Sequence, residues 1–262
     1  MRLHVAFHPS LLATGALWES PTPGVPPTPV PVDRPQVCVV VDVMRASTSL
    51  VTLVERGAGP IYIASSVASA RGSPYSRDGA VMAGEEEGLA PRGFDYGNSP
   101  VELSRAAVRG RPVVFVTTNG TAAIRAVQSL GPVLVGSMRN GEAVMAEGAK
   151  AARDGGVDVT IVCAGREGGF GLDDAHCAGY LASRLLDQAR YDLTDGAAAA
   201  VKLYRSEPDT MGVFTRATAG QNVIRLGLGA DVAYCAERET SSAVPRLGRE
   251  LRILGDLASN VT

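Results

Sequence analysis

Residues 37–43 read Val-Cys-Val-Val-Val-Asp-Val, an almost continuous apolar run in which β-branched residues dominate. Such a run is typical of a strand that is covered on both faces, as in a parallel sheet. Residues 45–56 follow with the spacing of a helix, and Gly57 is a suitable residue to end it. This stretch therefore predicts a buried strand that passes directly into a helix.

The same alternation of short apolar runs and helical segments continues along the chain. Further strands are predicted at 3–7, 61–64, 81–83, 113–117, 133–136, 157–163 and 231–235. Helices are predicted at 67–71, 99–108, 121–130, 141–153, 173–190, 197–204 and 221–226. Strands that alternate with helices predict an α/β protein with three layers, in which a largely parallel or mixed sheet, or sheets, carries helices on both faces.

The length of 262 residues allows one large or two small domains. We expect a single unit over residues 1–262, with two α/β subdomains as the alternative. Residues 20–35 read SPTPGVPPTPVPVDRP, which is too rich in proline to hold a helix. This segment is predicted to be an exposed, extended loop.

Composition excludes several classes of protein. The chain has 45% hydrophobic and 20% charged residues, as in ordinary globular domains, and a formal net charge of −2. We therefore expect no broad basic surface for nucleic acid. No apolar run approaches the roughly 20 residues that span a membrane, and the N-terminus does not resemble a signal peptide. Cys38, Cys163 and Cys235 lie in apolar runs and are expected to be buried free thiols. We expect a cytoplasmic protein, for which a homodimer is one allowed assembly.

In a parallel sheet, ligands bind beyond the carboxyl ends of the strands, so the polar residues after each apolar run are the informative ones. Asp42 and Arg45 follow the first quoted run, Glu85 follows residues 81–83, and Arg166 follows residues 157–163. Residues 117–121, Thr-Thr-Asn-Gly-Thr, lie between a strand and a helix. Carboxylates, an arginine and small hydroxyl residues at separate strand ends suit a divalent metal together with an anion.

Each of these signals also has a purely structural interpretation. Asp42 could be a hydrogen-bonded residue of the strand end, and residues 117–121 could be a simple turn with Thr121 as N-cap. The alternative for this turn is an anion site built from free backbone N–H groups. Asp173 and Asp174 could merely complement a helix dipole, and residues 85–87 could be a solvated charge run.

Taken together, several blocks resemble the 2-phosphosulfolactate phosphatase family, often called ComB. They are Asp-Val-Met-Arg-Ala-Ser-Thr-Ser at 42–49, Gly-Phe-Asp-Tyr-Gly-Asn-Ser-Pro at 93–100, Thr-Thr-Asn-Gly-Thr at 117–121, Gly-Ser-Met-Arg-Asn at 136–140, Cys-Ala-Gly at 163–165, Asp-Asp-Ala-His-Cys-Ala-Gly at 173–179, Gly-Ala-Asp-Val-Ala-Tyr-Cys-Ala at 229–236 and Val-Pro at 244–245. They follow the family's order from about residue 38 to residue 245, and Gly-Asn-Ser-Pro with Thr-Asn-Gly-Thr is a specific combination.

The resemblance implies a Mg²⁺-dependent phosphatase that hydrolyses 2-phosphosulfolactate to 3-sulfolactate and phosphate, on the route to coenzyme M. Asp42, Glu85 and Asp174 are then the candidate ligands of Mg²⁺. Asp42 and Arg45 are the candidate catalytic residues. The candidate substrate-binding residues are Asn98, Thr118, Asn119, Gly120, Thr121, Arg139 and Arg166.

The sequence departs from the family pattern at three places. Glu86 stands where members often have arginine, so an anion-binding cation is missing there and Arg92 is a candidate replacement. Asp173 stands where members have glutamate, and the proline-rich segment differs from the compact start of the family. Two other functions stay open: a phosphatase for another small phosphorylated hydroxy acid, and a protein that binds a phosphorylated metabolite without turning it over.

Overall fold

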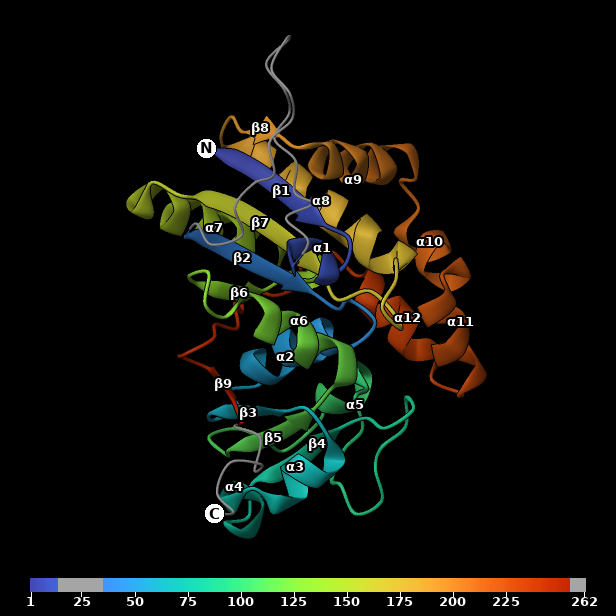
Figure 1. Cartoon of the computed structure of the whole chain (residues 1–262). Coiled ribbons are helices and arrows are strands. Elements are labelled where there is room, and N and C mark those ends of the chain that lie inside the picture. Colours follow the sequence, from blue (N-terminus) through green and yellow to red (C-terminus); the bar gives the residue numbers. More distant parts are fainter. Residues whose placement is uncertain (14–34, 255–262) are drawn as a thin grey trace.

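The computed structural model describes residues 1–13 and 35–254, and it contains two parallel sheets that lie one above the other (Figure 1). The predicted proline-rich loop lies outside the described residues except for Pro35. No helix of the described residues combines the length and the apolar character that crossing a membrane requires.

The larger sheet has five strands in the order β6-β2-β7-β1-β8, and every neighbouring pair is parallel. In this sheet Val39 of β2 pairs with Leu134 of β6 on one side and with Ile161 of β7 on the other. The strand bounds are β1 Arg2–Ala6, β2 Gln36–Val41, β6 Val133–Val135, β7 Asp158–Cys163 and β8 Asp192–Leu193.

The smaller sheet has four strands in the order β4-β5-β3-β9, again all parallel. Its strands are β3 Ile61–Ala64, β4 Val81–Gly84, β5 Val113–Val116 and β9 Leu251–Ile253. The predicted α/β class is confirmed, and of the two alternatives the sheets are parallel rather than mixed.

Helices cover both faces of each sheet. Helices α7 (Gly141–Gly155), α8 (Leu172–Gln188) and α9 (Asp195–Ser206) pack on the outer face of the larger sheet. Helices α2 (Ala46–Glu55) and α6 (Thr118–Val127) lie between the two sheets (Figure 1). The remaining helices are α1 Ser10–Ala13, α3 Val67–Gly72, α4 Pro74–Arg77, α5 Pro100–Leu103, α10 Thr210–Arg216, α11 Thr218–Arg225 and α12 Gly229–Ala236, with a 3₁₀ turn at Met138–Asn140.

Strand β2 explains why residues 37–43 are apolar at almost every position. Val39 points into the core shared with α7 and α8, whereas Val40 points into the core that contains α2 and the smaller sheet. Both faces of the strand are therefore buried, and no position on it is open to water. The last valine is followed by Asp42, where the strand ends and the chain turns toward α2.

The sequence analysis was wrong about one strand and about several bounds. Residues 231–235 lie in α12, because Asp231, Val232 and Cys235 are buried with helical rather than alternating spacing. An apolar run of this length does not distinguish the two structures. Of the helix predicted at 99–108, only the single turn of α5 forms, and α6 begins at Thr118 rather than Thr121. The short elements β8, β9 and α10 were not predicted.

Candidate active site

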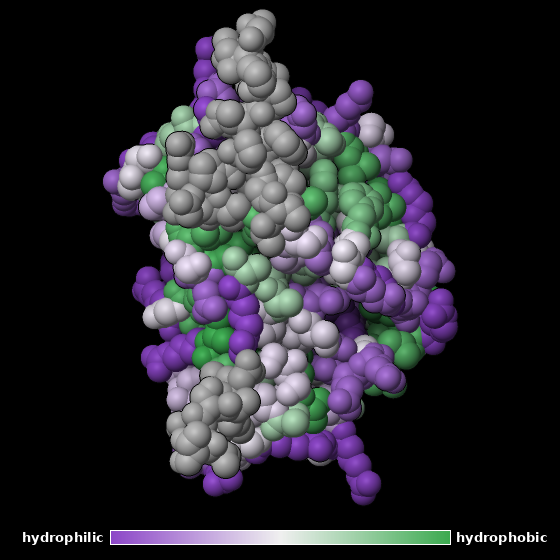
Figure 2. All heavy atoms as spheres, viewed as in Figure 1, coloured by the Kyte–Doolittle hydropathy of each residue, from purple (hydrophilic) through white to green (hydrophobic). Residues whose placement is uncertain are grey.

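A cavity of about 550 Å³ opens where the carboxyl ends of both sheets meet α11. Figure 2 shows hydrophilic residues around a hollow on the right-hand side of the molecule, beside α11 and α12 of Figure 1. Strand ends of both sheets and one helix thus form its walls. The lining residues are Asp42, Met44, Arg45, Glu85, Glu87, Gly88, Asn98, Thr117, Thr118, Asn119, Arg166, Glu167, Ala219, Asn222, Val223, Arg225 and Leu226.

Asp42 lies one residue beyond β2, and its carboxylate faces Gly120 of α6. A Cβ atom at Gly120 would stand 3.1 Å from Oδ2 of Asp42, so only glycine leaves this space free. Burial raises the pKa of Asp42 to about 7, and the negative charges of Asp173 and Glu85 add to the rise, while Arg45 opposes it. Asp42 can therefore change its protonation state near neutral pH.

Arg45 is held in a fixed orientation behind Asp42. Its Nη1 donates to Oδ2 of Asp231 at 2.9 Å and its Nη2 donates to the carbonyl oxygen of Gly88 at 2.5 Å. Asp231 in turn accepts a hydrogen bond from Oγ of Ser99 at 2.6 Å. The guanidinium is thus anchored at one edge, and the residue still lines the cavity.

Glu85 lies at the N-terminus of α6. Its Oε1 accepts hydrogen bonds from the backbone N–H and the hydroxyl of Thr118, both at 3.3 Å, and its Oε2 accepts from the N–H of Gly88 at 2.9 Å. Thr117 is the N-cap residue of α6 but makes no side-chain capping bond. The carboxylate of Glu85 therefore occupies part of the place that an anion would take at this helix end.

Thr121 has a structural position. It is the fourth residue of α6, it is buried, and its hydroxyl donates to the carbonyl oxygen of Ala64 at 3.2 Å. Thr121 is therefore not the N-cap that the turn interpretation predicted, and it does not line the cavity. Gly120 is likewise buried, and it acts on the cavity through its contact with Asp42.

The two aspartates at the start of α8 differ in their surroundings. Oδ1 of Asp174 accepts from the N–H of Val43 at 2.8 Å, and Oδ2 accepts from the N–H of Gly165 at 2.9 Å. Asp174 thereby ties the end of β2 to the end of β7, behind the cavity rather than in its lining. Burial raises the pKa of Asp173 to about 6. Among the neighbouring charges, that of Asp173 has the largest effect on the pKa of Asp42. The predicted ligand set therefore brings Asp42 and Glu85 to the cavity, but Asp174 uses both oxygens for backbone groups.

The lining carries one more carboxylate than guanidinium groups. Among the described residues, the carboxylates of Asp42, Glu85, Glu87 and Glu167 outnumber the guanidiniums of Arg45, Arg166 and Arg225. The described ranges contain no group of three or more His, Cys, Asp or Glu side chains arranged to hold a metal ion. The donors present thus suit a divalent cation that takes one or two carboxylates and completes its shell with water and phosphate, as Mg²⁺ commonly does.

The other predicted substrate-binding residues divide into two groups. Asn98 is buried and lines the cavity, and its Oδ1 has no hydrogen-bond partner in the described part of the chain. Arg166 lies at the rim, half-buried, and pairs with Glu167 at 3.1 Å. Arg139 does not line the cavity: it pairs with Glu237 and stacks over the ring of Tyr234 at 4.0 Å. These contacts give Arg139 a role in holding α12 rather than a place beside the substrate.

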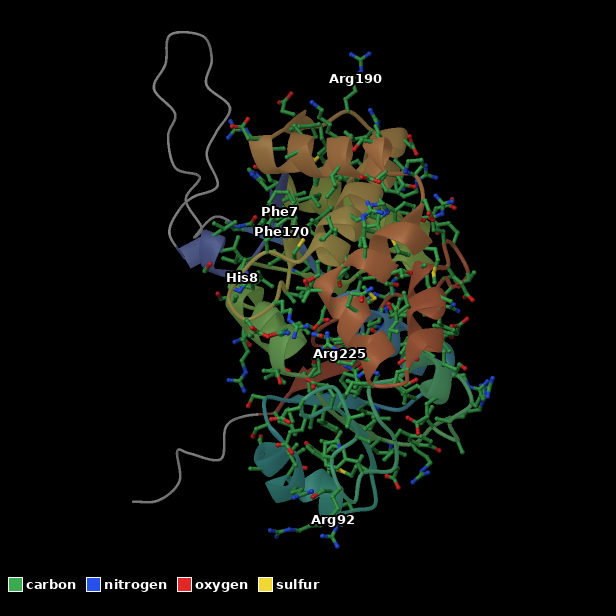
Figure 3. All side chains as sticks on the ribbon, turned by 90° about the vertical axis from the view of Figure 1, so that its right-hand side faces the viewer. Phe7, His8, Arg92, Phe170, Arg190 and Arg225 are labelled. Atoms are coloured by element: carbon green, nitrogen blue, oxygen red, sulfur yellow. The ribbon has the colours of Figure 1, made fainter. Side chains whose placement is uncertain are left out.

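Sequence reasoning missed the wall formed by α11 and the buried anchor Asp231. The spacing of residues 221–226 predicted a helix, but no preceding strand end indicated that it borders the site. Arg92, the predicted replacement cation, does not line the cavity, and Figure 3 shows it at the lower end of the molecule, whereas Arg225 lies near the middle. Arg225 is the additional arginine that the structure brings to the site.

The fold and the cavity define an α/β protein in which two parallel sheets carry acidic and guanidinium side chains to one polar site. The family model for 2-phosphosulpholactate phosphatase matches residues 27–250. The chain is 40% identical over 214 residues to a probable 2-phosphosulfolactate phosphatase of Deinococcus radiodurans, covering 81% of this chain and 88% of that protein. It is 41% identical over 215 residues to a protein of the same description from Thermus thermophilus, with coverage of 81% and 88%. The chain belongs to the 2-phosphosulfolactate phosphatase family, whose members are hydrolases.

Proposed function

We propose that this protein hydrolyses 2-phosphosulfolactate to 3-sulfolactate and phosphate, with Mg²⁺ as its cofactor. The observation that carries the proposal is the meeting of Asp42, the anchored Arg45 and the start of α6 in one cavity at the carboxyl ends of two parallel sheets. The description of the relatives supports the choice of substrate, and the geometry of the cavity supports the roles that we assign to its residues.

Phosphate binding is assigned to Arg45 and the start of α6. The ion pair with Asp231 and the bond to Gly88 fix the plane of the Arg45 guanidinium, so its remaining N–H groups can meet phosphate oxygens without reordering. Backbone N–H groups at the start of α6 that Glu85 does not engage favour an anion, and Asn98 lines the same cavity, where its side-chain N–H groups can donate to a phosphate oxygen. Phosphoryl transfer needs such positioning and neutralisation of charge more than covalent chemistry.

Mg²⁺ would be held by Asp42 and Glu85, with Asp173 close enough to contribute to the negative field. A net negative lining repels a substrate that carries a phosphate and two further acids, and a divalent cation offsets this repulsion. When bound, Mg²⁺ supplies charge neutralisation for the phosphate oxygens. Asp174 would support the site indirectly, by fixing the loop ends after β2 and β7.

Asp42 is the residue that we place next to the reacting phosphorus. Its carboxylate can take a proton from a water that attacks the phosphorus, or it can attack the phosphorus itself and displace 3-sulfolactate, leaving a phosphoryl group that water then removes. The first route releases phosphate in one step, whereas the second passes through a phospho-aspartate at Asp42. Acid quenching during turnover followed by mass spectrometry of the Asp42 peptide distinguishes the two routes.

The test is phosphate release from a panel of phosphorylated three-carbon acids that includes 2-phosphosulfolactate, measured with Mg²⁺ and again after exhaustive chelation with EDTA. We expect fastest turnover of 2-phosphosulfolactate, loss of activity in EDTA, and recovery when Mg²⁺ is returned. Turnover of other members but not of 2-phosphosulfolactate would replace the substrate by another phosphorylated hydroxy acid. Tight binding without any turnover would replace the enzyme by a metabolite-binding protein, and full activity in EDTA would remove the metal.

A further inference from the structure

Helix α11 brings to the cavity an arginine to which neither the predicted site nor the proposed mechanism gives a role. Arg225 and Asn222 both line the cavity, one turn apart on the same helix. Nη1 of Arg225 donates to Oδ1 of Asn222 at 2.9 Å, so the amide orients the guanidinium. Figure 3 shows Arg225 near the middle of the molecule, between the helices that follow α8 and the smaller sheet.

The three guanidiniums in the lining differ in how their charge is compensated. Arg45 forms an ion pair with Asp231, and Arg166 forms one with Glu167. Arg225, by contrast, donates to the neutral amide of Asn222, and no carboxylate of the described residues forms an ion pair with it. Among the described residues, Arg225 is therefore the guanidinium of the lining whose charge is not compensated by an ion pair, so it is available to an additional anion.

Arg225 reaches the cavity from a different element than the groups to which the phosphate is assigned. The phosphate is assigned to the strand ends and the start of α6, whereas Arg225 is exposed on the wall formed by α11. A substrate that carries a single anionic group can bind only one of these two cationic subsites. A three-carbon phosphoester with further acidic groups can meet both.

We propose that Arg225, oriented by Asn222, binds an acidic group of the substrate other than the phosphate and so determines specificity for multiply acidic phosphoesters. The proposal rests on the proposed function, because it needs the phosphate to bind at Arg45 and α6. A guanidinium presents parallel N–H donors that match two oxygens of a sulfonate or of a carboxylate. The experiment below separates these two groups.

The test compares kcat/KM for three substrates: 2-phosphosulfolactate, 2-phospholactate, which lacks the sulfonate, and phosphoisethionate, which lacks the carboxylate. Wild type and Arg225→Gln are assayed beside Arg216→Gln, a matched control on α10 whose exposed arginine pairs with Glu207 outside the cavity. We expect Arg225→Gln to lose about 10- to 100-fold in kcat/KM for 2-phosphosulfolactate, the size of a lost hydrogen-bonded contact between charged groups.

For the analogue that lacks the acidic group bound by Arg225, wild type and Arg225→Gln should have almost the same kcat/KM. For the analogue that keeps this group, Arg225→Gln should show the full loss of kcat/KM. Inhibition by inorganic phosphate should be unchanged in Arg225→Gln, because inorganic phosphate is expected to bind at Arg45 and the start of α6. Asn222→Ala should lose less than Arg225→Gln, with the same pattern across the substrates.

Three results would overturn the assignment: unchanged kinetics in Arg225→Gln, an equal loss for all three substrates, or weaker inhibition by inorganic phosphate. If the wild type turns over none of the substrates, it is the proposed function that fails. Calorimetric binding of 2-phosphosulfolactate to wild type and Arg225→Gln then tests the arginine independently, and equal affinities would reject it.

Discussion

Nη1 of Arg45 lies 2.9 Å from Oδ2 of Asp231, and the two side chains are only 4% and 1% exposed. A buried charge without a partner is costly, so this pair fixes both residues in one arrangement. Asp231 is fixed further by the hydroxyl of Ser99. Arg45 is therefore not a solvated arginine at the start of a helix, and the pair explains how a flexible side chain can present a planar set of donors to the cavity.

Arg45→Lys is expected to lower kcat by about 10² to 10³-fold, because lysine keeps the charge but cannot bond Asp231, Gly88 and a phosphate oxygen in one plane. Phosphate release at saturating substrate measures the effect, with Arg216→Lys as the control for a generic arginine-to-lysine change. Nearly full activity in Arg45→Lys would show that bidentate binding of phosphate by this residue is wrong.

Asp231→Asn is expected to reduce the free energy of unfolding by about 3 kcal/mol, since Arg45 would stay buried without a counter-charge. Ser99→Ala removes only one hydrogen bond to Asp231 and should cost about 1 kcal/mol. Urea denaturation of the two variants and the wild type provides the comparison. Equal stability of Asp231→Asn and wild type would mean that the pair does not order Arg45.

Gly120→Val is expected to abolish phosphate binding while the fold stays largely intact. The added Cβ would meet Oδ2 of Asp42 at 3.1 Å and the Cγ2 atom of Thr117 at 3.2 Å, so the start of α6 or Asp42 must move. Inhibition by inorganic phosphate is the readout. Gly148→Ala is the control, because a Cβ there has no neighbour nearer than 3.8 Å. Unchanged inhibition in Gly120→Val would remove this turn from the phosphate site.

The buried carboxyl of Asp42 should lower the stability of the metal-free protein as the pH rises from about 4 to about 7, against the opposite contribution of His176, whose pKa burial lowers to about 4. The pKa of Asp42 is raised from 3.8 to about 7, so in this range the native state holds a proton that the unfolded chain has released. Above pH 7 both states are ionised and the dependence should level off. Asp42→Asn should remove part of the slope and raise the free energy of unfolding at pH 8 by about 1 to 3 kcal/mol.

Urea melts across the pH series test this behaviour, with the exposed Asp187→Asn as the control. A wild-type protein that gains stability between pH 4 and 7, with no change of slope in Asp42→Asn, would contradict the buried position of this carboxyl.

The sequence predicted those parts of the fold and site that depend on neighbours along the chain. Val39 and Val40 indicate a strand buried on both faces, and Asp42 follows at its end, so the placement of this carboxylate needed no tertiary information. Glu85 and Thr118 were found by the same rule. The wall formed by α11 could not be found, because Arg225 reaches the cavity through tertiary packing rather than through a strand end.

Some errors came from patterns that two structures share. The run around Asp231 is short and apolar, which suits a strand as well as a helix, so the partner of Arg45 was placed in a strand. Asp173 and Asp174 are adjacent in the sequence, and nothing in the sequence shows that both carboxylate oxygens of Asp174 accept hydrogen bonds from the backbone N–H groups of Val43 and Gly165. Arg139 lies in a block typical of the family, yet its contacts are with Glu237 and Tyr234.

The most direct test of the active site is the initial rate of phosphate release from 2-phosphosulfolactate in the presence of Mg²⁺, measured for wild type, Asp42→Asn and Asp187→Asn. Asp42 is the carboxylate that the account places next to the phosphorus, and asparagine keeps its size while it removes both charge and basicity. We predict a loss of at least about 10²-fold for Asp42→Asn and wild-type rates for Asp187→Asn. Wild-type turnover by Asp42→Asn would contradict the location of the chemistry in this cavity.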